Sequence, residues 1–219
     1  MSPPVDVILP CLDEALALPG VLHALPAGYR AIVVDNGSTD GSPQVAANFG
    51  ATVVHEPRRG YGAAVHSGLL AATADVVCVI DADGSLDPGK LPDLVAELNS
   101  GTDLDLAVGR RVPTSRRAWP WHARIGNSLV AYLLRRRGVR VTDIAPMRAV
   151  RRKALLELDV RDRAFGYPLE LLLRAGAAGW TIVEQPVDYR PRTAGTVSKV
   201  SGSFRGTLRA TRDFGRVLR

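Results

Sequence analysis

The stretch VVCVIDADG, residues 76–84, places an apolar run directly before two aspartates that flank a single alanine. Five apolar residues in succession are typical of a strand that is buried on both faces. Because side chains alternate along a strand, we expect Asp81 and Asp83 to project to the same side. Gly84 then lets the chain turn away. The segment therefore predicts a core strand with two neighbouring carboxylates at its carboxyl end.

Paired carboxylates are costly to bury unless a cation lies between them. Oxygen ligands suit Mg²⁺ or Mn²⁺, and such an ion can in turn hold a diphosphate, so Asp81 and Asp83 are candidate metal ligands. The alternative is a solvated turn with two chance aspartates, since so short a motif recurs often. A calcium EF-hand is excluded, because Gly84 comes too early and Pro92 stands where the closing glutamate would be.

Apolar runs alternate with amphipathic segments through the first half of the chain. Strands are expected at 5–9, 30–34, 51–55, 75–80 and 104–109, and helices at about 15–25, 40–49, 62–73 and 88–100. This alternation predicts an α/β fold with a mostly parallel central sheet and helices on both faces. Ligands of such sheets bind beyond the carboxyl ends of the strands, where Asp35 and Asp81 fall.

The alternation weakens after about residue 110. Helices are expected at 122–137, 151–158 and 167–178, a strand at 180–185, and a basic helix from about Ser201. Because no repeat or low-complexity linker divides the 219 residues, we expect one continuous domain with a C-terminal helical elaboration.

The composition indicates an intracellular protein. The start, MSPPVDVILP, lacks the basic region of a secretory signal, and no apolar run approaches the roughly 20 residues that span a bilayer. The two cysteines, Cys11 and Cys78, do not suggest a disulfide framework. We therefore expect a reducing, cytoplasmic setting.

Charge divides the chain into two unlike halves. Residues 1–109 hold 4 Lys and Arg against 14 Asp and Glu, a net charge of −10, whereas residues 110–219 hold 24 against 8, a net charge of +16. The first half suits a metal, and the second suits phosphate or an anionic surface. Nucleic acid is not an expected partner, because zinc-ligand spacing, a recognition-helix signature and aromatic RNA-binding strands are all missing.

Seven segments resemble, in order, the motifs of a known family. Four are similar to family 2 glycosyltransferases: PCLDE (10–14), VVDNGSTDGS (33–42), RGYGAAVHSGL (59–69) and DADGSLDP (81–88). Three resemble the dolichyl- or polyprenyl-phosphate mannosyl- and glucosyltransferase subgroup: DIAPMRA (143–149), GYPLELLLRA (166–175) and YRPRTAGTVSK (189–199). The resemblance implies a single GT-A (Rossmann-like) domain. It also implies an inverting, Mg²⁺- or Mn²⁺-dependent enzyme that moves a hexose from a UDP- or GDP-linked sugar to a polyprenyl phosphate.

The resemblance implies a donor half over 1–110 and an acceptor half over 111–219. The residues that would bind the donor are Pro10, Cys11, Glu14, Asp35, Gly37, Ser38, Arg59, Gly60, Gly62 and Ala82. Glu14 would accept from the ribose and Asp35 from a ring N–H of the base, while the helix that opens at Arg59–Gly62 would offer backbone N–H groups to phosphate. Helix capping is the alternative role of Glu14 and Asp40, and ordinary turns are the alternative for the glycines.

A phosphate acceptor is already ionised, so it needs positive charge rather than a general base. Arg148 is expected to act with Asp81 and Asp83 in catalysis, because guanidinium groups match phosphate oxygens. The other residues expected to bind the acceptor are Arg110, Arg190, Arg192, Ser198 and Lys199. If the acceptor is instead a hydroxyl group, Glu170 is the candidate base, although a carboxylate near a helix start is also stabilised by the helix dipole.

The final residues suggest a membrane surface. Residues 199–219 carry six Lys and Arg against one Asp, interleaved with apolar side chains, which suits a helix lying on anionic lipid. We therefore expect a cytoplasmic enzyme that is peripheral on the inner face of the membrane. The alternative is a helix that packs its apolar stripe on the core.

The sequence departs from the family pattern at three places. Asp13 replaces the usual Asn, Asn36 replaces a second Asp, and Ser85-Leu86 follow the aspartate turn where Gln or His is common. Two other enzyme classes fit poorly: a nucleotidyltransferase needs a basic, glycine-rich loop after the first strand, and a dinucleotide oxidoreductase needs GxGxxG there. A non-catalytic membrane-surface or scaffolding protein would explain the basic half but not the paired carboxylates.

Overall fold

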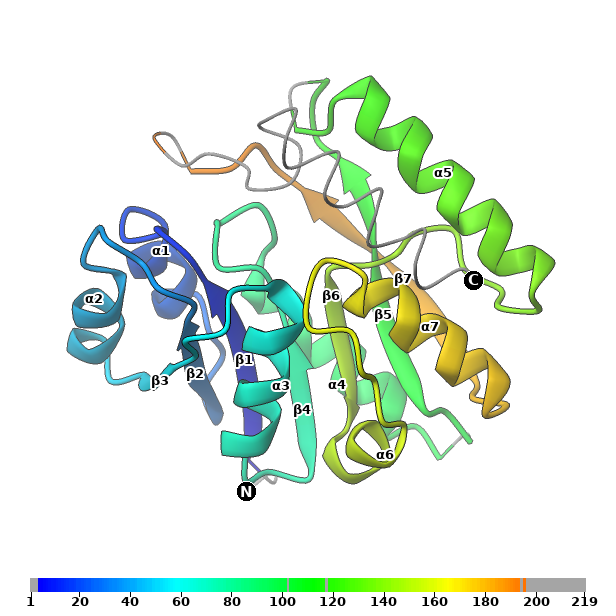
Figure 1. The fold of residues 1–219 in the computed structure, drawn as a ribbon, viewed down its shortest axis with the longest axis horizontal. Coiled ribbons are helices and arrows are strands. Elements are labelled where there is room, and N and C mark those ends of the chain that lie inside the picture. The colour runs from blue at the N-terminus through cyan, green and yellow to red at the C-terminus, as the bar shows by residue number, and fades with distance from the viewer. Residues whose placement is uncertain (1–3, 102, 117, 194, 196–219) are drawn as a thin grey trace.

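The structure, a computed structural model, describes residues 4–101, 103–116, 118–193 and 195. One seven-stranded sheet forms its centre (Figure 1). The strands are β1 (Val5–Cys11), β2 (Tyr29–Asp35), β3 (Thr52–His55), β4 (Val76–Val79), β5 (Leu106–Pro113), β6 (Met147–Arg151) and β7 (Ile182–Tyr189).

The strand order is β3-β2-β1-β4-β6-β5-β7. β6 runs antiparallel to its neighbours β4 and β5, and all other pairs are parallel. The predicted α/β fold with a mostly parallel sheet is therefore confirmed. β6 was not predicted, because its sequence MRAVR carries arginines at 148 and 151 that interrupt the apolar run.

Helices cover both faces of the sheet, as predicted (Figure 1). They are α1 (Leu18–His23), α2 (Ser42–Asn48), α3 (Tyr61–Ala71), the 3₁₀ turn η1 (Pro88–Lys90), α4 (Leu91–Leu98), α5 (Trp121–Arg136), α6 (Arg152–Glu157) and α7 (Tyr167–Ala177). Residues of α1, α2 and α4 form one core cluster, and those of α3, α5, α6 and α7 form the other.

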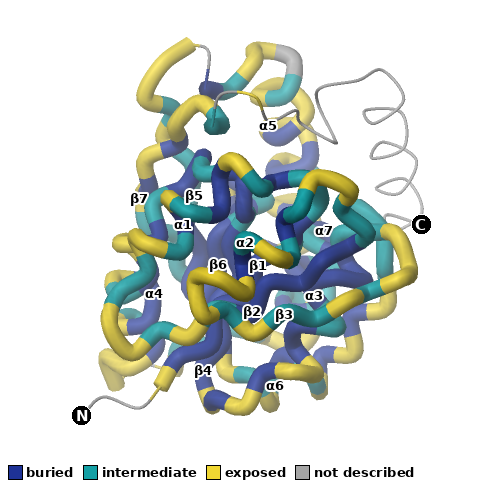
Figure 2. Tube along the Cα trace, turned by 90° about the vertical axis from the view of Figure 1, so that its left-hand side faces the viewer, coloured by how far each residue is buried: buried dark blue, intermediate teal, exposed yellow. Residues whose placement is uncertain are grey.

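Alternation places the two cores on opposite faces even along a strand that is apolar throughout. In β1, Val7 and Leu9 contribute to the core of α1, α2 and α4, whereas Ile8 contributes to the other core. Figure 2 shows the strands as a dark, buried centre beneath a more exposed outer layer. Within the described residues, the structure contains no helix with the length and apolar character that crossing a membrane requires.

The structure corrects the predicted ends of two strands, β4 and β7. β4 ends at Val79, so Asp81 and Asp83 lie in the turn after the strand, and strand alternation does not set their direction. β7 extends to Tyr189, beyond the predicted end at 185. The basic helix expected from Ser201 lies outside the described residues, as do the proposed acceptor residues Ser198 and Lys199.

Candidate active site

The loops after β1 and β2 are joined by hydrogen bonds beyond the carboxyl end of the sheet. The backbone N–H of Asp13 donates to Ser38 Oγ (2.9 Å), and that of Glu14 donates to Ser42 Oγ (2.9 Å). In the opposite direction, Thr39 N donates to Asp13 Oδ1 (2.8 Å). These contacts bring together the predicted donor residues of both loops, and they assign loop-fastening roles to Asp13 and Ser38.

Asp13 adopts a left-handed backbone conformation, with φ of 53°. Asn and Asp are the side chains other than glycine that tolerate this region best. The departure from the family's Asn at this position therefore keeps the backbone geometry. It also keeps an acceptor oxygen for Thr39.

Asp40 also joins the loop after β2 to the loop after β1. Its Oδ2 accepts from Ala15 N at 2.9 Å, and its Oδ1 accepts from both the backbone N–H and the hydroxyl of Ser42. These hydrogen bonds help to hold the pKa of Asp40 below its usual value, against the opposing effect of burial. Asp40 thus binds the first residue of α2, although the N-cap residue of this helix is Gly41.

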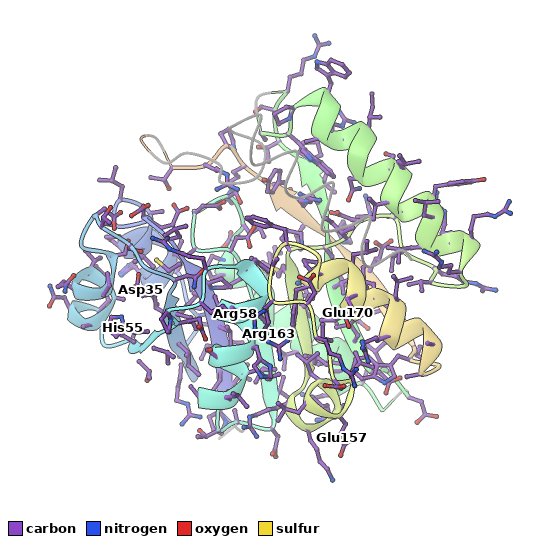
Figure 3. The ribbon with its side chains drawn as sticks, in the orientation of Figure 1. Asp35, His55, Arg58, Glu157, Arg163 and Glu170 are labelled. Atoms are coloured by element: carbon purple, nitrogen blue, oxygen red, sulfur yellow. The ribbon has the colours of Figure 1, made fainter. Side chains whose placement is uncertain are left out.

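Asp35 ends β2 and is almost fully buried. Its Oδ1 accepts from Ser38 N (2.9 Å), and its Oδ2 lies 3.4 Å from His55 Nδ1. Burial acts to raise the pKa of Asp35, but the hydrogen bonds from Ser38, His55 and Gly37 outweigh it and hold the pKa below its usual value. Figure 3 shows Asp35 and His55 together at the carboxyl ends of β2 and β3. The side chain is thus an ionised acceptor.

Gly37 allows an arginine to cover this turn. The residue has φ of 88°, and a Cβ atom there would lie 2.9 Å from Arg59 Cζ. The positive φ favours glycine at this position, and the absence of a side chain leaves room for the guanidinium. The structure therefore brings Arg59, a predicted donor residue, against the Asp35–Ser38 turn.

Asn36 is buried, and its side chain stabilises the loop that follows β3 by hydrogen bonds. Its Nδ2 donates to the carbonyl oxygens of Glu56 (2.9 Å) and Arg58 (2.8 Å). Its Oδ1 accepts from Gly60 N at 2.7 Å. An aspartate has no N–H group to donate, so the departure from the family's second Asp is a structural requirement of this loop.

Replacing Asn36 by aspartate should lower the free energy of unfolding by about 1–3 kcal/mol, because two carbonyl oxygens lose their donor and face a carboxylate. Urea denaturation measures this loss. The matched control is Asn99→Asp at an exposed position, where Oδ1 accepts from Arg151 at 3.2 Å and a carboxylate can do the same. Equal stability of the wild-type protein and the Asn36→Asp variant would show that the loop does not depend on the amide.

The expected phosphate site at the start of α3 is corrected by the structure. Gly62 N donates to Ala164 O (3.0 Å), and Ala63 N donates to Arg163 O (2.9 Å). Gly60 N is already bound to Asn36. These three N–H groups are therefore engaged within the protein, and the expectation that they bind phosphate is wrong.

The glycines at the start of α3 have a packing role instead. A Cβ atom at Gly60 would lie 2.1 Å from Arg163 O, and one at Gly62 would lie 2.3 Å from Asp162 O. Both positions therefore require glycine so that the loop over residues 162–164 can pack on α3. The segment RGYG joins the two halves of the chain, and of its predicted donor residues only the Arg59 side chain faces the turn after β2.

The aspartate turn after β4 is held by backbone contacts to the segment that follows β7. Asp83 O accepts from Thr193 N (3.1 Å), and Ser85 O accepts from Arg190 N (2.8 Å). The Asp83 side chain bonds within the turn, where Oδ1 accepts from Ser85 N (2.9 Å). Ala82 is buried in the core beneath. The motif YRPRT thus runs along the carboxylate pair, a neighbourhood of residues more than 100 positions apart in sequence.

Arg192 places a positive charge on the carboxylates. Its Nη1 lies 2.7 Å from Asp83 Oδ2 and 3.9 Å from Glu14 Oε1. Glu14 is buried, and its ion pair ties the loop after β1 to the aspartate turn. The sequence prediction placed Arg192 in the acceptor site, whereas the structure places it at the candidate metal ligands.

One carboxylate and three guanidinium groups act on the Asp81 side chain. Burial, with a further contribution from the neighbouring Asp83 carboxylate, raises the pKa of Asp81 to about 6. The guanidinium groups of Arg192, Arg111 and Arg148 act in the opposite direction. Asp83 is buried, whereas Asp81 is partly exposed. Two neighbouring carboxylates in this setting are stabilised by positive charge, which a bound metal ion would supply.

The donor set fits a hard divalent cation that shares its coordination with a ligand. In the described part of the chain, His, Cys, Asp and Glu side chains form no group of three or more suited to hold a metal. Asp81 and Asp83 therefore supply a pair of carboxylates and no closed protein cage. Mg²⁺ is commonly bound in this way, by one or two carboxylates together with substrate phosphates.

Arg148 is a fully buried arginine on β6. Its Nη2 donates to Ile144 O at 2.8 Å, while Nε and Nη1 meet no hydrogen-bond partner in the part of the chain that the structure describes. Tyr61 lies nearby: its pKa is raised to about 12, chiefly by burial and also by Asp81, with Arg148 opposing. Arg148 thus brings positive charge close enough to Asp81 to act on the pKa of that carboxylate, and its role in catalysis stays a prediction.

The Glu170 carboxylate is occupied by hydrogen bonds and an ion pair within the protein. Its carboxylate accepts from the backbone N–H groups of Arg161 (3.1 Å) and Asp162 (2.6 Å), and it pairs with Arg174 Nε at 2.5 Å. These contacts outweigh burial and lower its pKa. Figure 3 shows Glu170 on α7, across the molecule from Asp35. The structure therefore favours the structural alternative for Glu170 over a role as general base.

Arg111 was not among the predicted site residues, although it forms close contacts beside the site. Its guanidinium forms a double contact with Asp143 (Nε–Oδ2 2.9 Å, Nη2–Oδ1 2.6 Å) and lies 4.0 Å from the ring centroid of Trp119. The Tyr189 ring lies 5.4 Å from the same group. The signal for this pair in the sequence is Asp143, an acidic residue isolated within a basic region.

Two other predicted acceptor residues lie at the edge of this region. Arg190 is exposed and lies 3.3 Å from Asp87 Oδ2. Arg110 is half-buried on β5, next to Arg111, so strand alternation directs it to the opposite face of the sheet. The structure thus brings Arg148 and Arg192 to the carboxylates and leaves Arg110 and Arg190 further out.

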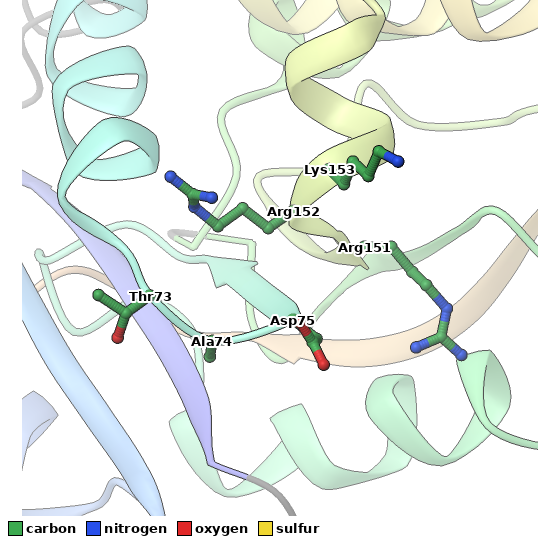
Figure 4. A pocket seen from close by; sticks show the side chains of 6 residues that line it. All are labelled: Thr73, Ala74, Asp75, Arg151, Arg152 and Lys153. Carbon is green, nitrogen blue, oxygen red and sulfur yellow. The ribbon is translucent and has the colours of Figure 1, made fainter.

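A separate hollow lies at the other end of β4 (Figure 4). It is lined by Thr73, Ala74, Asp75, Arg151, Arg152 and Lys153. Its basic side chains already have partners: Arg151 donates to Leu98 O (3.3 Å), Arg152 donates to Leu69 O (3.1 Å), and Lys153 lies 3.8 Å from Glu157. Since Asp75 precedes β4 and the carboxylate pair follows it, this hollow is not part of the candidate active site.

Comparison with known proteins agrees with this geometry. The model of glycosyl transferase family 2 matches residues 6–159. An uncharacterized glycosyltransferase of Mycobacterium tuberculosis is 60% identical over 98% of this chain and 97% of its own length. The polyprenol monophosphomannose synthase of Mycolicibacterium smegmatis is 34% identical over 90% of this chain and 81% of its own.

Solved structures show the same architecture. Glucosyl-3-phosphoglycerate synthase from M. tuberculosis, solved with Mn²⁺, UDP and glucosyl-3-phosphoglycerate, superposes with a TM-score of 0.78. The match covers 99% of this chain and 79% of that one, at 24% identity. The predicted GT-A (Rossmann-like) fold is thereby confirmed.

Proposed function

The chain belongs to glycosyl transferase family 2, and we propose that it transfers a hexose from a UDP- or GDP-linked donor to a polyprenyl phosphate. Membership of the family makes the protein a glycosyltransferase. The relative of M. smegmatis, at 34% identity, carries the name polyprenol monophosphomannose synthase, which supports the acceptor class. In this proposal residues 1–110 bind the donor and residues 111–219 bind the acceptor.

The donor nucleoside lies between the loops after β1 and β2 in this proposal. Asp35 is ionised and faces the turn that Ser38 completes, so it can accept from a ring N–H of uracil or guanine. Glu14 lies close by and can accept from the ribose. The Arg59 guanidinium, which covers Gly37, supplies positive charge near the phosphates.

Asp81 and Asp83 would hold a Mg²⁺ or Mn²⁺ ion on the donor diphosphate. The structural relative with Mn²⁺ and UDP supports this role. When bound, the ion would supply charge that stabilises the leaving diphosphate. Arg192 now forms the ion pair with Asp83, and a metal would compete with it for the same oxygen. The freed guanidinium would then be available to a phosphate.

The observation that carries the acceptor class is the buried Arg148. Its Nε and Nη1 have no hydrogen-bond partner among the described residues, and its charge reaches Asp81. A buried guanidinium group is costly without an anion, and a phosphate satisfies it with short, charge-assisted hydrogen bonds. An acceptor that arrives already ionised needs this arrangement, whereas a hydroxyl acceptor needs a general base.

The reaction is a single displacement at the anomeric carbon. A phosphate oxygen of the acceptor forms the new bond as the bond from the anomeric carbon to the diphosphate oxygen breaks, which inverts the configuration. Arg148 and Arg192 would hold the acceptor phosphate and offset its repulsion from the diphosphate. No proton has to be removed from the acceptor, in keeping with the engaged state of Glu170.

The test is a two-way screen in which product mass is measured. UDP-glucose and GDP-mannose, each with Mn²⁺, are offered either a polyprenyl phosphate or soluble hydroxyl acceptors, including 3-phosphoglycerate. We expect a hexosyl polyprenyl phosphate and no product with the soluble set. Transfer to a soluble hydroxyl alone would overturn the acceptor class and favour the second candidate, a family 2 transferase with a soluble acceptor, which the structural relative exemplifies.

Replacing Asp35 by alanine should weaken binding of the free nucleoside diphosphate by about 1–3 kcal/mol, because the base loses its charged acceptor. Isothermal titration calorimetry measures this change. Asp188→Ala, an exposed position on β7, is the control and should leave the affinity unchanged. An unaltered affinity in the Asp35→Ala variant would mean that this carboxylate only fastens the turn.

We further propose that the enzyme works at the inner surface of a membrane, where a polyprenyl phosphate resides. The net charge of +16 over residues 110–219 supports attraction to anionic lipid. A non-catalytic scaffolding protein would share this charge but has no use for Asp81, Asp83 and Arg148 in one place.

A further inference from the structure

The inner face of α5 packs on the body of the protein. Its buried residues are Asn127, Val130, Ala131 and Leu134, which follow the spacing of a single helix face. Val130 and Leu134 belong to the core cluster of α3 and α7. This face is therefore the one by which α5 contributes to the core.

The outer face of α5 carries a second apolar stripe, which is exposed. The exposed fractions are 73% for Trp121, 60% for Ile125, 59% for Leu129 and 50% for Tyr132. Steps of four, four and three residues place these side chains on one line along the helix. At 100° per residue, this line lies on the side opposite Asn127 and Leu134. Figure 1 shows α5 at the outside of the molecule, along its upper right edge.

The segment that contains the stripe has basic residues and no acidic ones. Residues 114–142 contain seven arginines and no Asp or Glu. Those that lie on or directly after α5 and are exposed are Arg124, Arg135, Arg136 and Arg137. Aromatic side chains stand near both ends of the stripe, as is typical of side chains at a membrane–water boundary.

α5 is held firmly against the candidate active site. Asn127 Oδ1 accepts from Ile144 N (3.1 Å) and lies 3.3 Å from Arg111 Nη2, and Asn127 Nδ2 donates to Thr142 O (3.2 Å). The helix therefore presents its outer stripe in a fixed orientation. It also connects that stripe to the Arg111–Asp143 pair beside the site.

We infer that the outer face of α5 is the surface with which this protein docks on anionic membranes. The apolar stripe would enter the boundary between headgroups and acyl chains, and the flanking arginines would meet the lipid phosphates. A second copy of the chain fits less well, because a two-fold contact would bring the same arginines face to face. The inference rests on the proposed work at a membrane surface and names the face that meets the lipid, and docking itself requires neither the donor nor the acceptor.

The test is sedimentation of the full chain with vesicles of phosphatidylglycerol and phosphatidylcholine, without any nucleotide sugar or polyprenyl phosphate. Replacing Leu129 by glutamate should weaken vesicle binding by about tenfold or more, because a charge replaces an inserted apolar group. The matched control is Leu70→Glu on α3, whose side chain is 58% exposed. It should bind vesicles as the wild-type chain does.

A second pair of variants tests the electrostatic part. Arg136→Ser should weaken binding about fivefold, the usual contribution of one basic residue near anionic lipid. Lys153→Ser on α6, also exposed, should have no effect. Binding of the wild-type chain should fall with added salt and with vesicles of phosphatidylcholine alone. Thermal unfolding of each variant shows whether it is folded.

Three results would overturn the inference. Vesicle binding that is equal in the wild-type chain and the Leu129→Glu variant would exclude α5, and its loss on Phe204→Glu would assign docking to residues 199–219. A dimer that Leu129→Glu dissociates, with no vesicle binding, would assign the stripe to a second copy. Because no glycosyl transfer is measured, failure of the proposed acceptor leaves this test unaffected.

Discussion

Replacing Asp83 by asparagine should lower turnover by about a hundredfold or more. Asp83 and Asp81 would carry the divalent ion, and loss of its charge at the leaving diphosphate removes several kcal/mol of transition-state stabilisation. Asp83 is also the partner of Arg192, at 2.7 Å, so the amide weakens the shorter of the two ion pairs described for this arginine, the other being with Glu14 at 3.9 Å. Initial rates with the donor that the screen identifies measure the effect.

Asp87→Asn is the control for this change. Asp87 lies in the same loop, its Oδ1 accepts from Gly89 N at 2.9 Å, and its partner Arg190 is exposed. An asparagine keeps the acceptor oxygen, so turnover should stay close to that of the wild-type enzyme. Turnover that survives both Asp83→Asn and an excess of chelator would rule out the metal role.

Replacing Asp143 by alanine should lower the free energy of unfolding by about 3–5 kcal/mol, because it leaves the Arg111 guanidinium buried without its carboxylate. Asp143 is itself buried and also accepts from the backbone N–H of Arg111 (2.8 Å). The pair joins β5 to the segment before β6 and, through Asn127, to α5. Urea denaturation followed by circular dichroism measures the loss.

Two further variants make this result specific. Glu157→Ala removes a largely exposed partner of Lys153, 3.8 Å away, and should change stability by less than about 0.5 kcal/mol. Adding Arg111→Met to Asp143→Ala should recover part of the loss, since no charge then remains buried. A loss below about 1 kcal/mol in Asp143→Ala would mean that water or another group compensates Arg111.

The local patterns of the chain were sufficient for most of the fold. Apolar runs and helical periodicity predicted every strand except β6, as well as the helices on both faces, because both signals are carried by residues next to one another. The carboxylates after β4 and Asp35 at the end of β2 were also predictable. The carboxyl ends of parallel strands meet at one edge of the sheet, so residues at those ends converge whatever lies between them.

Local patterns failed where a residue's role depends on a distant partner. Arg148 and Arg151 hide β6 from an analysis of apolar periodicity, yet β6 lies between β4 and β5 in the sheet. The first turn of α3 looked open to phosphate until the structure placed the carbonyl oxygens of Arg163 and Ala164 on its N–H groups.

Residue patterns were enough to establish the family, the α/β architecture and the edge of the sheet at which the carboxylates gather. The tertiary structure alone decided which charges meet there: Arg192 on Asp83, Arg148 buried beneath the turn, and Arg111 paired with Asp143. The physical reason is that strand and helix formation follow from periodicity over a few residues. The pairing of buried charges depends instead on how distant segments pack together, in one case segments more than 100 residues apart. No local pattern encodes such a pairing.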